Sequence, residues 1–165
     1  MFYDLNKIEQ IGKILDILEN CQGIEQERLY HPEGDVFNHS LQVYKWALRE
    51  TNDIDLLFAA LLHDVGKQID SHEHEKYGTA LLGDLISDKT RWLIDNHMRF
   101  WNYIIGRMRK YKKTIRLANH EYFVELAQLG RWDNLGRNPK VKIQYDRIVI
   151  INEIKGRTEN HGKNK

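Results

Sequence analysis

An unbroken run of seven apolar residues, 56–62, ends directly in His63 and Asp64. A helix that is apolar all round is buried all round, so other segments of the chain must surround it. The imidazole and the carboxylate at its end are then buried too, and buried charged groups must be paired or must bind a metal. Adjacent helical residues point about 100° apart, so these two pair poorly with each other but can approach one cation. We interpret them as half of a metal site, with Gly66 as a helix stop.

Three further polar residues lie beside core-type residues on helical patterns of their own: His39, His97 and Asp133. The helices of a bundle can direct such side chains to one point. A mixed His/Asp ligand set suits Mn, Fe, Co, Ni, Zn or Mg. The alternatives are a hydrogen-bonded core histidine at positions 39 and 97, and turn chemistry for Asp133 ahead of Gly136.

The order His39, His63-Asp64, Asp133 resembles the ligand set of the HD superfamily of metal-dependent phosphohydrolases. Within this superfamily, the chain is most similar to the HD domain of bacterial tRNA nucleotidyltransferases, the CCA-adding enzymes. Similar motifs follow one another in the expected order over about residues 30 to 138, at 30–41, 61–67, 74–80, 96–99 and 131–137. The resemblance implies an all-α bundle around a divalent metal ion, and phosphatase or phosphodiesterase activity, 2′,3′-cyclic phosphates included.

The resemblance also implies a role for the matched residues. The expected ligands of the first ion are His39, His63, Asp64 and Asp133, and Asp64 would bridge to a second ion if one is bound. The expected ligands of that second ion are His74 and His97, although the number of ions stays open. His72 could compete with His74, but the spacing to Gly78 favours His74.

Charged residues near the motifs are candidates for catalysis and substrate binding. The catalytic candidates are Asp64, Lys67 and Glu33, and the candidates for phosphate binding are Lys67, Arg99, Arg131 and Arg137. Lys67 could instead be a favourable charge at a helix C-terminus. Glu33 and Asp35 could orient a ligand or transfer a proton, or could cap the following helix.

Helical periodicity dominates the chain. Apolar residues recur at intervals of three and four over seven segments, 5–20, 36–50, 54–65, 75–86, 89–97, 113–136 and 140–156. Asp53 and Asp88 are expected to be N-caps of the third and the fifth helix. We therefore predict an all-α HD-domain bundle of about six to seven helices, with residues 1–165 as a single domain.

The single cysteine, the N-terminal residues and the lengths of the apolar runs indicate the compartment in which the protein is expected. The single Cys21 excludes an internal disulfide and fits a reducing compartment. The N-terminus has no signal-peptide pattern, and no apolar run is long enough to span a membrane, so we expect a soluble, cytoplasmic protein. Residues 1–29 are too short for a nucleotidyltransferase head, and we do not expect nucleotide polymerisation.

The two parts of the chain differ in charge. Residues 1–98 hold 9 Lys/Arg against 18 Asp/Glu, a net charge of −9, whereas residues 99–165 hold 16 against 6, a net charge of +10. Basic residues from Arg99 to Arg116 have Trp101, Tyr103 and Tyr111 among them, a pattern that can bind phosphates and stack bases. The alternative is a solvated face. Because this cluster begins two residues after His97, we expect it, with its densest part Arg107 to Arg116, near the mouth of the metal site.

Three function classes remain after these arguments. The first is a metal-dependent phosphohydrolase that acts on a nucleotide or an RNA end. The second is a dinuclear iron oxygenase of the kind that some HD relatives are, although Lys67 and the basic segment favour phosphate. The third is a non-catalytic RNA-binding module that a metal stabilises. The exact substrate, the native metal and the oligomeric state cannot be read from the sequence.

Overall fold

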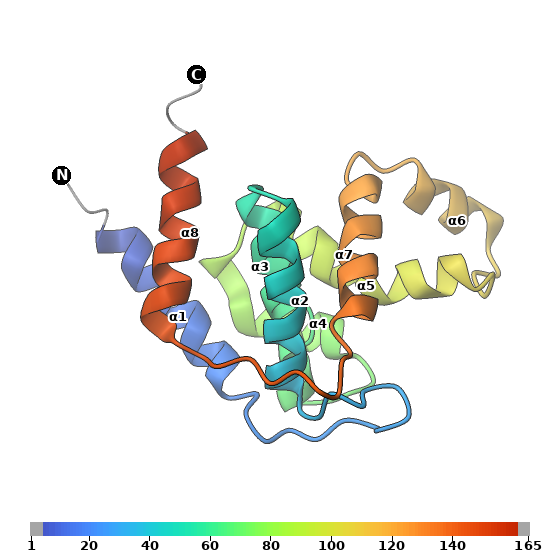
Figure 1. The fold of residues 1–165 in the computed structure, drawn as a ribbon. Helices are drawn as coiled ribbons and strands as arrows, with labels where there is room; N and C mark the ends of the chain where they lie inside the picture. Colours follow the sequence, from blue (N-terminus) through green and yellow to red (C-terminus); the bar gives the residue numbers. More distant parts are fainter. Residues whose placement is uncertain (1–4, 162–165) are drawn as a thin grey trace.

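The computed structural model describes residues 5–161, and in this part the regular elements are all helices (Figure 1). The α-helices are α1 (Leu5–Glu19), α2 (Val36–Glu50), α3 (Ile54–Leu62), α4 (His74–Leu82), α5 (Asp88–Ile104), α6 (Tyr111–Ala118), α7 (Phe123–Leu135) and α8 (Arg147–His161). Two short 3₁₀ helices, η1 (Val65–Gln68) and η2 (Gly83–Leu85), follow α3 and α4. The predicted all-α fold is confirmed.

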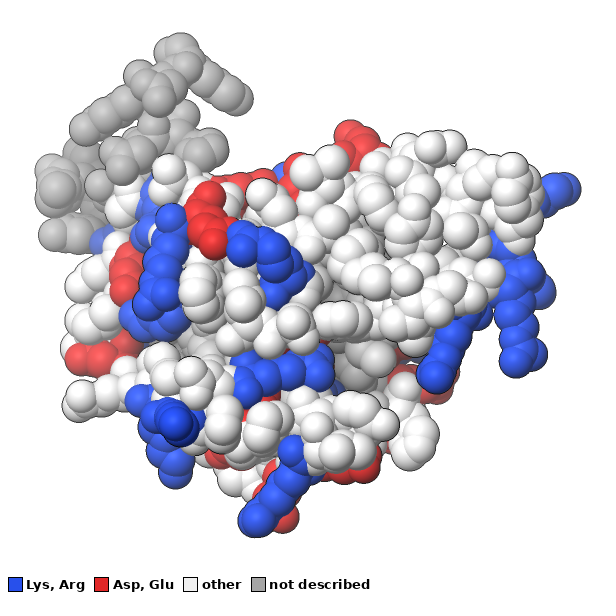
Figure 2. Space-filling view, turned by 45° about the vertical axis from the view of Figure 1, so that its right-hand side comes forward, with Lys and Arg blue, Asp and Glu red and all other residues white. Residues whose placement is uncertain are grey.

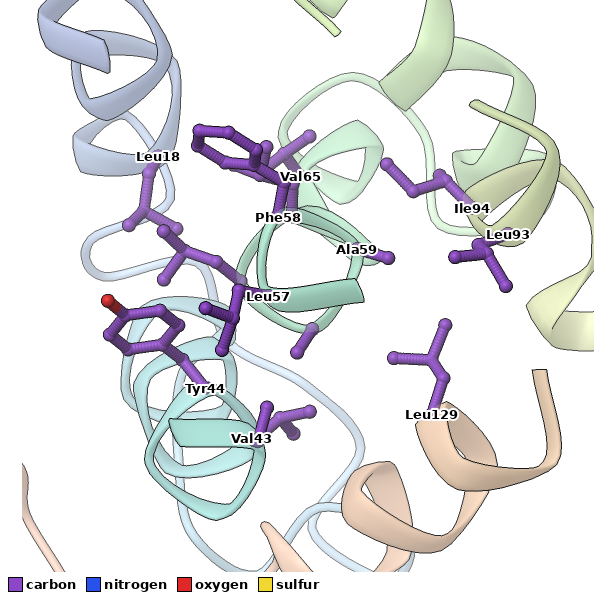
Figure 3. Close-up of a cluster of buried hydrophobic side chains, with 14 of the residues drawn as sticks. Leu18, Val43, Tyr44, Leu57, Phe58, Ala59, Val65, Leu93, Ile94 and Leu129 are labelled. Carbon is purple, nitrogen blue, oxygen red and sulfur yellow. The ribbon is translucent and has the colours of Figure 1, made fainter. Parts of the chain in front are cut away.

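Helix α3 forms the centre of the bundle. Its residues Leu56–Leu62 are all buried, as their uninterrupted apolar sequence predicts. Figure 3 shows the side chains that surround it, which come from α1, α2, α5 and α7. Fully burying one leucine stabilises the fold by about 1.5–3 kcal/mol, and α3 buries four of them, at positions 56, 57, 61 and 62.

The beginnings of two helices test the predicted caps. Asp53 caps α3 as expected, since its Oδ1 accepts hydrogen bonds from the backbone N–H groups of Asp55 (3.0 Å) and Leu56 (3.3 Å). The cap of α5 is Ser87 rather than Asp88, because the Ser87 hydroxyl accepts from the N–H of Thr90 at 3.0 Å. Helix α5 also continues to Ile104, well beyond the predicted end at position 97.

The prediction of a single helix over residues 113–136 is wrong. Helix α6 ends at Ala118 and α7 begins at Phe123. Between them the His120 ring stacks on Trp92 of α5, with ring centroids 3.8 Å apart, and its Nδ1 accepts from the N–H of Tyr122. This contact with another helix breaks a pattern that is helical by periodicity alone.

The last helix begins later than its apolar stripe predicts. The prediction was 140–156, but α8 spans Arg147–His161, with Asp146 accepting from two backbone N–H groups at its start. Residues 137–146 form instead a non-helical segment along α2, with a turn at residues 139–140. Its backbone is satisfied by the side-chain amides of Asn38 and Gln42, which bond to groups of residues 138, 141 and 143 at 2.9–3.1 Å.

The two terminal helices pack side by side at one end of the bundle (Figure 1). Arg147 of α8 joins them through ion pairs with Asp16 and Glu19 of α1, each at 2.8 Å. Among the described helices, none combines the length and the apolar character that crossing a bilayer needs.

Candidate metal centre

Six side chains from distant parts of the sequence converge beside the end of α3. They are His39 of α2, His63 and Asp64 after α3, His74 of α4, His97 of α5 and Asp133 of α7. All six are at most 4% exposed. The structure therefore brings together every residue that the sequence proposed as a metal ligand.

Asp64 lies at the middle of this group, and its two carboxylate oxygens face different histidines. Oδ1 is 3.1 Å from Nε2 of His74 and 3.6 Å from Nε2 of His97. Oδ2 is 3.6 Å from Nε2 of both His39 and His63. One carboxylate thus joins two clusters of possible ligand atoms.

Asp133 belongs to the cluster on the Oδ2 side. Its Oδ1 is 3.0 Å from Nε2 of His39 and 3.8 Å from Nε2 of His63. We call His39, His63, Asp64 and Asp133 the first subsite, and Asp64, His74 and His97 the second subsite. Each subsite contains three residues whose ligand atoms all lie within 4.8 Å of one another.

Backbone carbonyl groups fix the tautomer of all four histidines of the centre. A carbonyl oxygen can only accept, so each ring must carry a proton on Nδ1 and direct Nε2 at the subsite. The bonds join His39 to Gly136 (3.1 Å), His63 to Ala60 (3.0 Å), His74 to Ser71 (2.8 Å) and His97 to Ile94 (2.6 Å). This arrangement of the second nitrogen is the usual one around metal-binding histidines.

The Nε2 atoms approach one another closely in both subsites. Those of His39 and His63 are 3.2 Å apart, and those of His74 and His97 are 3.0 Å apart. Two imidazole lone pairs at such distances require a positive charge between them, either a proton or a metal ion. Ligands about 2.0–2.1 Å from one octahedral ion lie roughly 3 Å apart, so the donor set fits a divalent cation in each subsite.

Glu33 lies behind His39, on the side away from the other ligands. Its Oε1 accepts from Nδ1 of His31 at 3.0 Å and forms an ion pair with Nδ1 of His39 at 2.6 Å, beside the bond of that nitrogen to the carbonyl oxygen of Gly136. Burial by itself would raise the pKa of Glu33, but these two histidines lower it to about 2. Glu33 is therefore placed to orient His39, and it does not line the cavity over the subsites.

His39 carries a proton when no cation is bound. Burial by itself would lower its pKa, but hydrogen bonds to Asp133 and Glu33 outweigh burial and raise the pKa to about 9. The same kind of burial, without a carboxylate partner as close, lowers the pKa of His63 to about 3. Nε2 of His39, which faces Asp133, is the nitrogen that would bind a metal ion, so a proton on this atom and a metal ion exclude each other.

Lys67 of η1 reaches the bridging carboxylate. Its Nζ is 2.7 Å from Oδ2 of Asp64 and donates to Oε1 of Gln26 at 2.6 Å. Burial would raise the pKa of Asp64, but the Lys67 ammonium, together with the histidines, holds it well below its usual range. The Lys67 side chain, 12% exposed, also lines the cavity above the subsites.

Trp101 and Arg137 hold Asp133 from the cavity side. The indole N–H of Trp101 donates to Oδ2 of Asp133 at 2.9 Å, and Arg137 Nη2 is 3.2 Å from Oδ1. The Arg137 guanidinium lies over the Trp101 ring, 5.6 Å from its centroid. The sequence proposed Arg137 but missed Trp101 as a site residue, although Trp101 follows His97 by one helical turn.

A cavity of about 620 Å³ opens over the two subsites. Asp64, His74 and Asp133 form part of its floor, and Lys67 and Arg137 contribute positive charge to its wall. The segment before α2 supplies the opposite wall, which includes Ile24, Gln26, Tyr30 and His31. A cavity of this volume is in the range of sites that hold a small-molecule ligand.

Several residues singled out in the sequence lie elsewhere. Arg131 forms an ion pair with Glu50, and Arg99 bonds to Oδ1 of Asn96; neither lines the cavity. His72 is exposed, so His74 is the residue of that segment that enters the centre. Asp35 is the cap of α2, accepting from the N–H of Asn38 at 2.8 Å.

The basic segment Arg107–Arg116 does not lie at the mouth of the cavity, contrary to our expectation. None of its residues lines the cavity over the subsites. The end of α5 carries this segment, together with α6, away from the centre of the bundle (Figure 1). The prediction failed because α5 continues for two turns after His97.

Gly66 is not the helix stop that its position suggested. It does not have the positive φ of such a glycine, and it lies inside η1. A Cβ atom at Gly66 would lie 1.8 Å from the carbonyl oxygen of His74 and 2.5 Å from the backbone nitrogen of Gly78. Gly66 is therefore required for the close approach of α4, which carries His74 to Asp64.

Comparison with known proteins agrees with this geometry. The model of the HD domain family matches residues 36–149, most of the chain. This range includes all six residues of the two subsites.

Curated relatives carry the name Multifunctional CCA protein. The protein from Burkholderia multivorans is 34% identical over 160 aligned residues, which cover 83% of this chain and 38% of the relative. The protein from Nitrosococcus oceani is 39% identical over 79 residues, 44% of this chain and 20% of the relative. The chain thus spans well under half the length of the relatives it matches.

Proposed function

The chain belongs to the HD domain family, and we propose that it is a metal-dependent phosphohydrolase for a nucleotide or an RNA-terminal phosphate, 2′,3′-cyclic phosphates included. The observation that carries the proposal is the position of Asp64. Its two oxygens face separate histidine pairs, so that one carboxylate can bridge two cations. The CCA proteins among the relatives support an RNA end as a substrate class.

The first subsite would hold one divalent ion, and the second subsite a second and weaker one. Mn, Ni, Co, Mg, Fe and Zn all suit a mixed His/Asp set. Bound divalent cations supply Lewis acidity, which lowers the pKa of water and withdraws charge from a phosphoryl oxygen. The first subsite offers two histidines and two carboxylates, whereas the second offers two histidines and only the shared carboxylate, which is why we expect weaker binding there.

The residues of the chain position the substrate and balance its charge. Lys67 lies between Asp64 and the cavity, where its ammonium can pair with a phosphate oxygen. Arg137 is placed to bind another oxygen from the opposite side, since it lines the cavity while bonded to Asp133. Trp101 offers an aromatic surface on which a base can stack. Glu33 acts only through His39, so it is a positioning residue.

The test is hydrolysis by protein that is first stripped of metal and then reloaded with each of these ions in turn. The substrates are 2′,3′-cyclic, 2′- and 3′-mononucleotides, RNA ends and p-nitrophenyl phosphate. We expect turnover only with metal, and a loss of about a hundredfold or more in Asp64→Asn, larger than for a residue outside the ligand set. Asp84→Asn, an exposed aspartate away from the centre, is the matched control. Full activity of Asp64→Asn would refute the proposal.

The same experiment separates the other two function classes. The four histidines and two aspartates also suit a dinuclear iron oxygenase, which would contain iron and would turn over only with oxygen. A non-catalytic RNA-binding module would bind RNA without hydrolysing any substrate of the panel. The position of Lys67 and Arg137 in the cavity favours a phosphate-bearing ligand over the substrate of an oxygenase, and hydrolysis separates the phosphohydrolase from the RNA-binding module.

A further inference from the structure

The segment 96–120 carries a large excess of positive charge. It contains seven Lys or Arg residues and no Asp or Glu. These residues are Arg99, Arg107, Arg109, Lys110, Lys112, Lys113 and Arg116. In the structure the segment forms the second half of α5, the connection after it, and α6.

Two adjoining cavities lie between α5 and α6, with volumes of about 680 and 390 Å³. They share Asn102, Met108 and Lys113 in their walls, so we describe them together as the α5–α6 groove. Six cationic residues line the groove: Arg99, Arg107, Arg109, Lys110, Lys113 and Arg116. No carboxylate is among its lining residues.

These cations have no ionic partners among residues 6–158, the part of the chain whose side chains the structure describes. Elsewhere the chain behaves differently: Lys45, Lys67, Lys89 and Arg147, for example, each pair with an aspartate or a glutamate. Gathering six unpaired positive charges costs electrostatic energy, which a polyanionic ligand would offset. Figure 2 shows Lys and Arg side chains projecting from the right-hand end of the face that it draws.

Aromatic rings accompany the cations. Trp92 and His120, which stack on each other, form one end of the groove. Tyr111, at the start of α6, is 77% exposed and lies between Lys110 and Lys112. Cations that follow a backbone and rings that can stack with bases are the two elements of single-strand recognition.

The groove and the cavity over the metal subsites open on neighbouring faces of α5. Met98 and Trp101 line the cavity, and Arg99 and Asn102, the next residue after each, line the groove. A strand whose end lies in the cavity can therefore cross α5 and continue into the groove. Helix α6 leaves the groove accessible, since Leu117 is its only buried residue.

We propose that the α5–α6 groove binds the phosphate backbone of a single-stranded RNA and holds it beside the metal centre. The role that we give to this binding, to hold an RNA end for hydrolysis, rests on the proposed function. The binding itself does not depend on it. Binding is measured separately from hydrolysis, so that each can fail without the other.

The test is fluorescence anisotropy of a 5′-fluorescein oligouridylate of about 12 nucleotides on the metal-loaded chain. The oligonucleotide ends in a 3′-hydroxyl, so there is no terminal phosphate to remove. Single-strand binding falls with salt by about 0.7 in logarithmic slope per phosphate contact, so six contacts give a slope of about −4. Affinity should then fall roughly 300-fold between 50 and 200 mM salt.

The variant Arg109→Ala/Lys110→Ala/Lys113→Ala removes three of the six cations. It should bind less tightly, with a slope of about −2 and a loss of only about 20-fold over the same salt range. The matched control, Lys13→Ala/Lys76→Ala/Lys140→Ala, removes the same charge from exposed positions outside the groove and should retain the wild-type slope. An unchanged slope in the groove variant, or an equal change in the control, would overturn the proposal.

Two competing occupants are tested in the same assay. If polyglutamate competes as well as unlabelled RNA, the groove is a site for an acidic protein and the proposal is wrong. A salt-sensitive dimer that the groove variant abolishes would assign the groove to the acidic half of a second copy, which also overturns it. Hydrolysis of a 2′,3′-cyclic mononucleotide by the wild-type protein tests the proposed function alone, because that substrate is too short to reach the groove.

Discussion

Replacing Gly66 with alanine should separate α4 from η1 and remove His74 from the metal centre. The added Cβ would lie 1.8 Å from the carbonyl oxygen of His74, which is backbone and cannot rotate away. Ordinary contact begins at 3.4 Å, so the start of α4 must move by roughly 1.6 Å, the difference between the two distances.

A displacement of this size is large for the metal centre. His74 Nε2 lies 3.1 Å from Oδ1 of Asp64, and metal–ligand distances tolerate only about 0.2 Å of variation. The second subsite should therefore lose its ion, while the first subsite, which takes no residue from α4, should retain its ion. Overpacking of this kind also costs about 1–3 kcal/mol in the free energy of unfolding.

Urea unfolding of the metal-free protein measures the cost in stability, and elemental analysis with calorimetric titration measures the number of ions. Gly78→Ala is the matched control on the other side of the same contact. Its Cβ would come no closer than 3.3 Å to Gly66, so a shift of a few tenths of an ångström accommodates it. Wild-type stability together with an unchanged number of ions in Gly66→Ala would refute this reasoning.

Three further results are expected. Because the pKa of His39 is raised to about 9, a metal ion must displace a proton from this residue at neutral pH. Metal binding at the first subsite should therefore weaken as the pH falls below 9, and it should release about one proton. Calorimetry in buffers of different ionisation enthalpy measures this release. His97→Asn should lose only the weaker ion, whereas Asp133→Asn should lose the tighter one, and elemental analysis that finds the reverse would contradict the division into subsites. Arg137→Ala should raise KM for phosphate substrates several-fold, whereas Arg131→Ala, outside the cavity, should change neither KM nor kcat; equal effects in steady-state assays would show that the cavity does not bind the substrate.

Much of the fold follows from local patterns. The apolar run 56–62 has no polar face, so it can only be the central helix, and the structure places it there. Asp53 as the cap of α3 also follows, since it depends on neighbouring residues alone. The boundaries that failed depend on distant contacts. The stacking of His120 on Trp92 separates α6 from α7, and amide side chains of α2 bond to the backbone of the non-helical segment 137–146.

The candidate metal centre, like the fold, follows from the sequence only in part. The sequence by itself determined which residue types are available, because a histidine and an aspartate at the end of a buried helix need a cation or a partner. Only the tertiary structure decided which of them lie together. Trp101 bonds to Asp133 in the centre, whereas Arg99 bonds to Asn96 and Arg131 to Glu50, outside it. It also gave Gly66 its role, since close approach of two backbones is a property of packing and leaves no mark in local periodicity.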